Sequence, residues 1–409
     1  MKLLALFSTI GLALLSMSGP TVAAPTGAQP DVVPNQYIVT LKPTTNLAQF
    51  SRALLSEMSR ERESATATDG VMPTLGHQVT IGSSFKAVVG VLTEDMVRKL
   101  KANGQVASVE PDHIVRAFET TQINPPSWGL ARISRRTGNQ GSYSFPDKQG
   151  DGVDVYVLDT GIEPNHPEFR GFGQPRSFAP FRSEAQWTPN DEHGHGTHVA
   201  GTIAGTRYGV AKRARVHGVK VLEKDGTGST SGTIRAMEWV AREIRRVGKT
   251  AVCNMSYGVG YRNSPDLNAQ EKAVAALFEA GCVVVKAAGN ESQDACNVTP
   301  ARTRQGLTVA GLAADGQSID TSYSNFGRCV NIVAPGSSIS SAWINNSYKV
   351  ASGTSMAAPH VAGAAALILG QEPWLKPQEV VDRILSRASQ GVITSGLNGT
   401  PNRVVYVGQ

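Results

Sequence analysis

Cysteine, aromatic residues and charged residues are all scarce in this chain of 409 residues. There are four cysteines, and aromatic and charged residues make up 6% and 18% of the sequence. Four cysteines are too few for a small domain that depends on disulfides, so that class is excluded. Beyond residue 17 no apolar run is long enough to cross a bilayer, and we expect no membrane partner. The net charge of +6 comes without a basic cluster, so we expect no nucleic-acid partner either.

The first residues have the pattern of a secretory signal peptide. Met1 and Lys2 form a short charged start, residues 3–17 are apolar, and small residues at 21–23 offer a cleavage site. This apolar run is too short to span a membrane, and segments of this kind are removed on export. We therefore predict a signal peptide over residues 1–23 and a secreted, extracellular protein.

A small mixed unit is predicted between residues 34 and 117. Strand-like and helical patterns alternate along it, at 36–41, 47–63, 85–92, 94–101 and 106–112. This alternation indicates an α+β domain that is separate from the rest of the chain. Residues 118–127 are polar, contain two adjacent prolines and lack a periodic pattern, so we expect an exposed linker there.

The long C-terminal part alternates between buried strands and helices. Apolar runs lie at 153–158, 216–222, 250–255, 281–288, 307–312 and 330–334, and helical stretches include 231–247 and 266–280. Strands that alternate with helices indicate a mostly parallel sheet covered on both faces, which is a three-layer α/β domain. Functional side chains of such domains lie at the carboxyl ends of the strands.

Three residues far apart in the chain have the properties of a catalytic triad. Ser355 and His195 each open a helical run, and Asp159 follows the apolar run at 153–158. A hydroxyl becomes a nucleophile only when a neighbouring base takes its proton. Ser355 would attack a carbonyl carbon, His195 would take and return the proton, and Asp159 would orient the imidazole. The chain order Asp, His, Ser is that of subtilisin.

Four segments carry a resemblance to the subtilisin family of serine proteases. They read Asp-Thr-Gly-Ile at 159–162, His-Gly-Thr-His-Val-Ala-Gly-Thr at 195–202, Ala-Ala-Gly-Asn at 287–290 and Gly-Thr-Ser-Met-Ala at 353–357. Residues 128–133, 294–297 and 400–406 resemble the proteinase K branch, and especially aqualysin-like enzymes.

The resemblance implies a division of the chain into functional parts. A subtilisin-like peptidase domain would occupy residues 121–409. A small ferredoxin-like propeptide at 24–120 would inhibit it until the enzyme cuts the chain near Thr120 and Thr121. The implied protein is a serine endopeptidase made as an autoprocessed zymogen.

The resemblance also assigns residues around the triad. The side-chain amide of Asn290 and the backbone N–H of Ser355 would stabilise the oxyanion of the tetrahedral intermediate. The residues expected to contact an extended peptide are Gly226, Thr227, Gly228, Ser256, Tyr257, Gly258, Ala287, Ala288 and Gly289. Pairing with a peptide backbone favours broad specificity. The small residues at 287–289 would leave room for a large apolar or aromatic side chain before the scissile bond. The enzyme would act as a monomer on polypeptides, with no cofactor required for catalysis.

The four cysteines fall into two pairs with different expectations. Cys296 and Cys329 match a disulfide of aqualysin-like enzymes, so the resemblance implies that they are bonded. Cys253 and Cys282 lie in or beside buried strands, and we expect them to be free core thiols.

A structural calcium ion is a further expectation from the resemblance. The site of the proteinase K branch maps onto Arg304, Gly306 and Asn331, with asparagine in place of the family's aspartate. An uncharged ligand weakens calcium binding. Lys286 places a charge inside an apolar strand and needs a partner that the sequence does not reveal.

Two further expectations concern residues near His195. Glu192 and Lys224 stand where aqualysin-like enzymes carry a second disulfide, and we expect an exposed ion pair between them. His193 and His198 flank His195 and could form a zinc cluster with it, but no Glu or Cys completes the set at metalloprotease spacing. A catalytically inactive member of the family that serves as a binding scaffold is the alternative function, and the intact triad argues against it.

Overall fold

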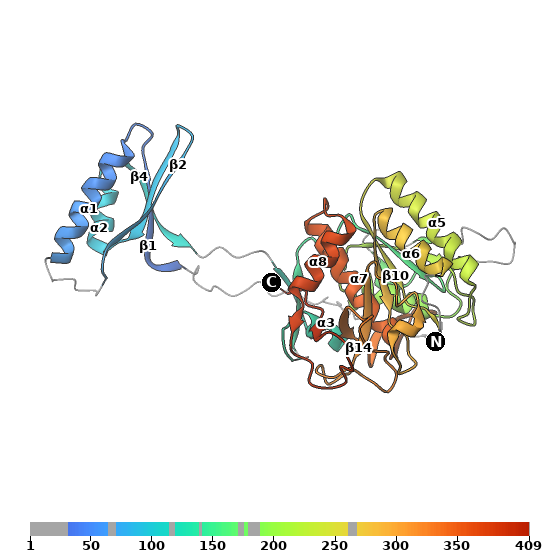
Figure 1. The fold of residues 1–409 in the computed structure, drawn as a ribbon. Helices are drawn as coiled ribbons and strands as arrows, with labels where there is room; N and C mark the ends of the chain where they lie inside the picture. Colours follow the sequence, from blue (N-terminus) through green and yellow to red (C-terminus); the bar gives the residue numbers. More distant parts are fainter. Residues whose placement is uncertain are drawn as a thin grey trace, which may run out of the picture. The chain divides into compact units, whose positions relative to one another are not determined.

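The computed structural model describes residues 32–63, 71–113, 119–138, 141–170, 176–178, 189–260 and 268–408. The chain divides into two compact units, Met1–Ala117 and Phe118–Gln409 (Figure 1). The expected signal peptide lies outside the described residues.

In the first unit, two helices lie against a four-stranded antiparallel sheet (Figure 1). The elements in chain order are β1 (Val32–Leu41), α1 (Leu47–Glu63), β2 (Thr74–Ile81), β3 (Phe85–Val91), α2 (Glu94–Lys101) and β4 (Val106–His113). The sheet order is β2-β3-β1-β4, and the βαββαβ sequence of elements is the ferredoxin-like arrangement that was expected. Both helices have the predicted bounds, and the Thr93 hydroxyl caps α2 by accepting from the Met96 N–H at 3.2 Å.

Several strands have no counterpart among the predicted elements. β2 is one of them, and it pairs with β3. Another is β5 (Glu119–Ile123), which occupies the segment predicted to be a linker and pairs antiparallel with the equally unpredicted β6 (Ser142–Pro146). The remaining ones are short strands of the second unit. The linker prediction was wrong because β5 is polar and shows no apolar period. Its backbone hydrogen bonds come from β6, a partner that local pattern cannot reveal.

The second unit is built on a nine-stranded sheet. Its strand order is β18-β19-β15-β14-β12-β10-β7-β9-β8, and every pairing is parallel except that of β18 with β19. The sheet strands are β7 (Asp154–Asp159), β8 (Arg176–Phe178), β9 (Arg215–Lys220), β10 (Ala251–Met255), β12 (Cys282–Ala287), β14 (Leu307–Leu312), β15 (Ile332–Pro335), β18 (Ser389–Gln390) and β19 (Arg403–Val404). Two short ribbons pair β11 (Val259–Gly260) with β13 (Val298–Thr299) and β16 (Ile339–Trp343) with β17 (Ser347–Ala351).

Helices cover both faces of this sheet, as predicted (Figure 1). They are α3 (Trp128–Ile133), α4 (His195–Ala204), α5 (Thr230–Val247), α6 (Ala269–Glu279), α7 (Thr354–Gln371) and α8 (Pro377–Arg387), with short 3₁₀ turns at η1 (Pro167–Phe169) and η2 (Ala295–Asn297). Alternate residues of β7 show why. Val155 and Val157 pack in the core with α4, α7 and α8, whereas Tyr156 and Leu158 pack in the core with α5 and α6. Successive side chains of a strand point to opposite faces, so a strand buried on both faces is apolar throughout.

Both pairs of cysteines form disulfides. Cys296 and Cys329 are bonded as predicted, with Cα atoms 5.3 Å apart. Cys253 and Cys282 are also bonded, with Cα atoms 6.0 Å apart, and the expectation of free thiols was wrong. β10 and β12 are neighbours in the sheet, and their register sets Cys253 diagonally across from Cys282 on one face. Each bond closes a loop of 29 or 33 residues and contributes about 3–4 kcal/mol on the chain-entropy account.

Candidate active site

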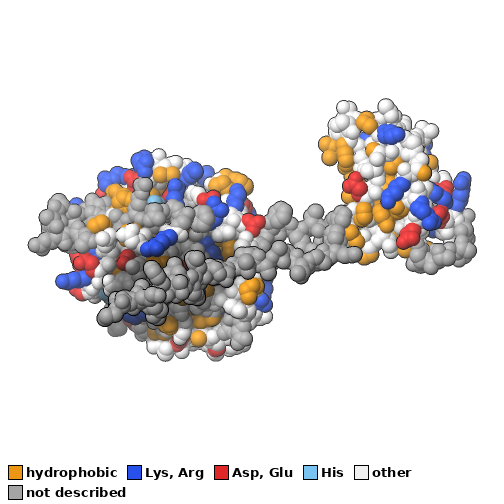
Figure 2. Space-filling model, turned by 180° about the vertical axis from the view of Figure 1, so that it is seen from behind, with side chains coloured by type: hydrophobic (Ala, Val, Ile, Leu, Met, Phe, Trp, Pro, Cys, Tyr) orange, Lys and Arg blue, Asp and Glu red, His pale blue; other side chains and the backbone are white. Residues whose placement is uncertain are grey.

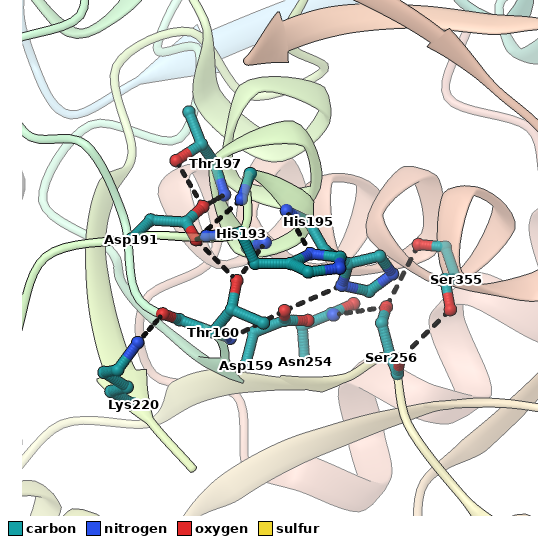
Figure 3. Close-up of polar contacts among 12 residues, drawn as sticks. Asp159, Thr160, Asp191, His193, His195, Thr197, Lys220, Asn254, Ser256 and Ser355 are labelled. Atoms are coloured by element: carbon teal, nitrogen blue, oxygen red, sulfur yellow. Dashed lines mark hydrogen bonds and ion pairs between the residues drawn. The ribbon is translucent and has the colours of Figure 1, made fainter. Parts of the chain in front are cut away.

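Three neighbouring strands end where the predicted catalytic residues lie. β7 ends at Asp159, Ser256 directly follows β10, and Asn290 follows β12 after a short turn. The strands are adjacent in the order β12-β10-β7 and run parallel, so their carboxyl ends share one edge of the sheet. His195 and Ser355 reach this edge from the starts of α4 and α7 (Figure 3). The site therefore lies where a parallel sheet places its functional side chains.

His195 is the first residue of α4, and Asp191 holds the turn before it (Figure 3). Asp191 Oδ1 accepts from the backbone N–H groups of His193 and Gly194 at 2.9 and 2.8 Å. Its Oδ2 accepts from the N–H and the hydroxyl of Thr197 at 2.9 and 2.7 Å. The carboxylate thus satisfies N–H groups at the helix start that lack intrahelical partners, and its charge suits that end of the helix. Sequence reasoning missed this role, although an acidic residue shortly before the helix was an available signal.

The buried Asp159 pairs with the half-buried His195. His195 Nδ1 lies 2.7 Å from Asp159 Oδ1, and the same oxygen accepts the Thr160 N–H at 2.8 Å. Burial by itself lowers the pKa of the His195 imidazole. The charge and hydrogen bond of Asp159, together with the charge of Asp191, outweigh this effect and raise the pKa above its ordinary value. The pairing leaves Nε2 of His195 as the ring atom that can accept a proton from a substrate-side group.

We expect the activity to be lost on acidification, with a midpoint above the ordinary histidine pKa of about 6.5. His195 must be neutral to act as a base, and its raised pKa means that it holds a proton up to a higher pH. Activity is therefore full above this pKa and falls as the pH drops through it. Values of kcat/KM measured between about pH 5 and pH 9 check this. A flat profile over that range would exclude His195 as the base.

Ser355 is hydrogen-bonded to Ser256, one of the residues expected to contact substrate, rather than to His195. Its Oγ donates to the Ser256 carbonyl oxygen at 3.0 Å, and Ser256 Oγ donates to the Ser355 carbonyl oxygen at 3.0 Å (Figure 3). Asn254 Nδ2 donates to Ser256 Oγ at 2.9 Å and holds this reciprocal pair in place. No hydrogen bond joins Ser355 to His195 in the part of the chain that the structure describes. The bond to Ser256 must therefore break before Ser355 can pass a proton to the imidazole.

Asn290 is exposed, and Thr354 fixes the direction of its amide. Asn290 Oδ1 accepts from the Thr354 N–H at 2.8 Å and from the Thr354 hydroxyl at 2.9 Å. The Thr354 hydroxyl in turn accepts from the Gly289 N–H at 3.1 Å. With its oxygen held in this way, the Asn290 amide presents Nδ2 as a donor. Ser355 is the second residue of α7, so its N–H also lacks an intrahelical partner. Thr354 is a positioning residue that sequence reasoning did not identify.

The residues expected to contact substrate differ in exposure. Thr227, Gly228 and Gly258 are exposed, Gly226, Tyr257 and Gly289 are half-buried, and Ser256, Ala287 and Ala288 are buried. The Tyr257 ring packs against the core under α5 and α6. A pocket between these segments would therefore be shaped by backbone and small side chains, apart from Tyr257.

The predicted calcium ligands fit a metal ion poorly. Asn331 Oδ1 accepts the Thr308 N–H at 2.7 Å, so the oxygen expected to bind calcium already serves the backbone. Within the described ranges, no group of three or more His, Cys, Asp or Glu side chains is arranged to hold a metal. The carbonyl oxygens of Arg304 and Gly306 remain as candidate ligands, and calcium binding stays a prediction.

The expected ion pair of Glu192 with Lys224 is not formed. Glu192 Oε2 lies 3.7 Å from the ammonium of Lys220, which also donates to the Thr160 carbonyl oxygen at 2.7 Å. Lys220 is buried and Glu192 is half-exposed, whereas Lys224 is exposed and has no ion pair with any described residue. The alignment of the two loops paired Glu192 with Lys224, and the structure pairs it with Lys220 at the end of β9 instead. The fully buried Lys220 has more to gain from the carboxylate than the solvated Lys224.

Comparisons with known proteins agree with this geometry. A profile of the Subtilase family matches residues 150–406, and a profile of Peptidase inhibitor I9 matches residues 36–118. Subtilisin-like protease 9 of Arthroderma benhamiae is 36% identical over 413 residues, which cover 98% of each chain.

Other similar proteins cover most of the chain. Subtilisin-like serine protease AsES of Sarocladium strictum is 43% identical over 329 residues, covering 80% of this chain and 81% of that protein. A cuticle-degrading protease of Metarhizium anisopliae is 40% identical over 327 residues, with the same coverage. The crystal structure of a cold-adapted subtilisin-like serine proteinase is 41% identical, covers 68% of this chain and 97% of that chain, and superposes with a TM-score of 0.62.

Proposed function

The chain belongs to the subtilase family of serine proteases, and we propose that it is a secreted endopeptidase that cleaves polypeptides with broad specificity. The observation that carries the proposal is the 2.7 Å contact between Asp159 and His195, on the sheet edge where Ser355 lies in the first turn of α7. A buried carboxylate that orients an imidazole beside a helix-start serine supports nucleophilic acyl transfer.

In the proposed reaction, substrate binding releases Ser355 from the Ser256 carbonyl. Ser355 Oγ then attacks the scissile carbonyl carbon, and its proton passes to His195 Nε2. The tetrahedral intermediate collapses as the C–N bond breaks, and the leaving amine takes the proton from His195. Water repeats the sequence to hydrolyse the acyl-enzyme. Asp159 stabilises the imidazolium at each proton transfer.

Asn290→Ala is expected to lower kcat by about 10²–10³-fold while changing the affinity for peptide inhibitors little. The Nδ2 of Asn290 would meet the oxygen only when it carries negative charge, so the lost donor acts on the transition state. Thr354 is the contact that orients this amide, and Thr354→Val is expected to produce a smaller loss of the same kind. Steady-state kinetics beside inhibitor binding tests the assignment. An equal loss in both measurements would contradict an oxyanion role.

The specificity proposal rests on the small residues at the end of β12. Ala287, Ala288 and Gly289 leave space for a large apolar or aromatic side chain before the scissile bond. The segments 226–228 and 256–258 offer mainly backbone to a substrate, which suits recognition with little regard to sequence. One similar protein is named a cuticle-degrading protease, but the natural substrate proposed here is polypeptide in general.

A zymogen that matures outside the cell fits the remaining observations. The match to Peptidase inhibitor I9 covers the first unit, which we propose inhibits the peptidase until it is cut near Thr120 and Thr121.

Two disulfides suit an oxidising compartment, as does the expected signal peptide. In the described ranges no helix combines the length and apolar character needed to cross a bilayer. On the face drawn in Figure 2, basic side chains are dispersed among acidic and apolar ones, which supports the proposal of no nucleic-acid partner.

Inhibitor labelling and substrate profiling together test the proposed function. Purified protein should hydrolyse casein, and a serine-directed covalent inhibitor should abolish this activity and add its mass to the peptide that contains Ser355. Cleavage of a peptide library should then favour large apolar or aromatic residues before the scissile bond. Labelling of a different residue, or casein hydrolysis that resists the inhibitor, would refute the proposal.

A further inference from the structure

A lysine is completely buried at the end of the strand that leads to Asn290. Lys286 lies in β12, is 0% exposed, and points its amino group out of the sheet toward the next loop. Its Nζ donates to the carbonyl oxygens of Thr303 and Gln305 at 2.5 and 2.7 Å. Both acceptors lie in residues 298–306, which comprise β13 and the turn before β14 and which we call the 298–306 loop. One side chain therefore ties β12 to this loop through two hydrogen bonds.

A second buried charge holds the other side of the same loop. Glu271, which is 0% exposed in α6, accepts from the Thr299 hydroxyl at 2.6 Å and pairs with the guanidinium of Arg302. Glu271 also completes the capping box of α6 with Asn268. The loop is thus fastened to α6 by a carboxylate and to β12 by an amino group. Buried charges of this kind are kept where their hydrogen bonds are all made.

The 298–306 loop contacts both segments that are expected to line the substrate pocket. Its first residues form β13, which pairs with β11 directly after Gly258. A Cβ at Gly258 would lie 2.9 Å from Val298 Cγ1, so the backbone of the 256–258 segment packs directly against the loop. At the other end, Gly306 has φ +80°, and a Cβ there would lie 2.1 Å from the Val284 carbonyl oxygen of β12. The loop therefore spans from the 256–258 segment to the strand that ends at Ala287.

This loop is also where the resemblance places calcium. An amino group can fix the backbone carbonyls of the loop in a similar way. A cation among backbone carbonyls neutralises their partial charges and fixes their positions. Lys286 donates from within the chain to two carbonyl oxygens of this loop, while Asn331 is engaged by the Thr308 N–H. Burial lowers the pKa of Lys286 to about 7, and the charge of Glu271 opposes this. An ammonium has three N–H donors and a neutral amine has two, so both forms can serve the two carbonyls.

We propose that Lys286 is a positioning residue that holds the 298–306 loop in place of a metal ion and thereby sets the spacing of the two walls of the substrate pocket. The part of this proposal that concerns the pocket rests on the function proposed above. The part that concerns the loop does not, since a clamped loop is measurable in an inactive protein.

Hydrogen exchange measures the clamp directly. Wild-type enzyme, inactivated with a serine-directed inhibitor, is compared in EDTA and in excess calcium chloride by following peptides that cover residues 298–306. The same measurement is made on Lys286→Met. Lys212→Met is the matched control, because Lys212 also donates to backbone carbonyls, those of Gly209 and Arg207 at 2.9 and 3.3 Å, but in a different loop.

We expect equal protection of the wild-type loop in EDTA and in calcium. Lys286→Met should exchange at least about ten-fold faster in this loop, because the carbonyls of Thr303 and Gln305 lose their donor, and calcium should not restore the protection. Lys212→Met should leave the loop unchanged. If EDTA opens the wild-type loop and calcium closes it again, a metal holds the loop and the proposal is wrong. Because the comparison of EDTA with calcium uses only the wild-type enzyme, it tests the proposal even if Lys286→Met does not fold.

Kinetics measures the consequence for the pocket. Lys286→Met should raise KM for a peptide with phenylalanine before the scissile bond by about ten-fold, with kcat within about three-fold of wild type. KM for the matched alanine peptide should change little, since a small side chain does not fill the pocket. Unchanged KM values beside an opened loop would overturn the positioning role. Absence of any peptide hydrolysis by wild type would instead refute the proposed function and leave the exchange result standing.

Discussion

Ser355→Ala should abolish peptide hydrolysis and leave the chain as an uncut precursor. The Oγ atom is the proposed nucleophile, and the other hydroxyl at the start of α7, that of Thr354, is fully buried and donates to Asn290 Oδ1. Removal of the nucleophile from the triad of subtilisin lowers kcat by about 10⁶-fold, and we expect a loss of the same order here. Casein hydrolysis and the mass of the purified chain measure both effects.

A trace of wild-type enzyme is the control for this experiment. If Ser355→Ala is folded, added wild type should cut it near Thr120 and Thr121 and yield a product of mature mass. Self-maturation of highly purified Ser355→Ala, with no other protease present, would contradict the assignment of the nucleophile.

Asp159→Asn should lower kcat by about 10⁴-fold with little change in stability or KM. The carboxylate accepts the Nδ1 proton of His195 at 2.7 Å, which keeps Nε2 free to receive the proton of Ser355. An amide at this position can donate to Nδ1 instead, and the ring then carries its proton on Nε2, where it cannot act as a base. The amide also cannot stabilise the imidazolium by charge. The pKa of His195 should therefore fall, so that any residual activity extends to lower pH.

The chain offers a matched control for this substitution. Asp154 lies on the same strand and has a carboxylate oxygen 2.7 Å from Nε2 of His217, so it repeats the Asp–His contact at the other end of β7. Asp154→Asn removes a charge from a similar Asp–His contact, although Asp154 also pairs with Arg215 at 3.0 Å, and it should leave kcat within about two-fold of wild type. Similar losses in the two variants would mean that the effect of Asp159→Asn is structural.

Local pattern was sufficient for most secondary structure of this protein. The bounds of α1 and α2 follow from apolar periodicity and from the Thr93 cap, and the core strands of the second unit follow from continuous apolar runs. Once these runs are recognised as parallel strands, the sheet edge that carries Asp159 and Asn290 is also predictable. β5 escaped prediction because its regularity lies in its backbone pairing with β6 and not in its side chains.

Contacts between distant segments required the folded chain. The Cys253–Cys282 bond depends on the adjacency and register of β10 and β12, neither of which is encoded within either strand. The choice of Lys220 over Lys224 as the partner of Glu192 depends on burial, which follows from how β9 packs. Lys286 shows the same limit most clearly. Its sequence context shows a charge that needs a partner, and the structure shows that the partners are carbonyl oxygens of the 298–306 loop. Every residue has a backbone carbonyl, so the amino-acid sequence does not indicate which carbonyls accept these hydrogen bonds.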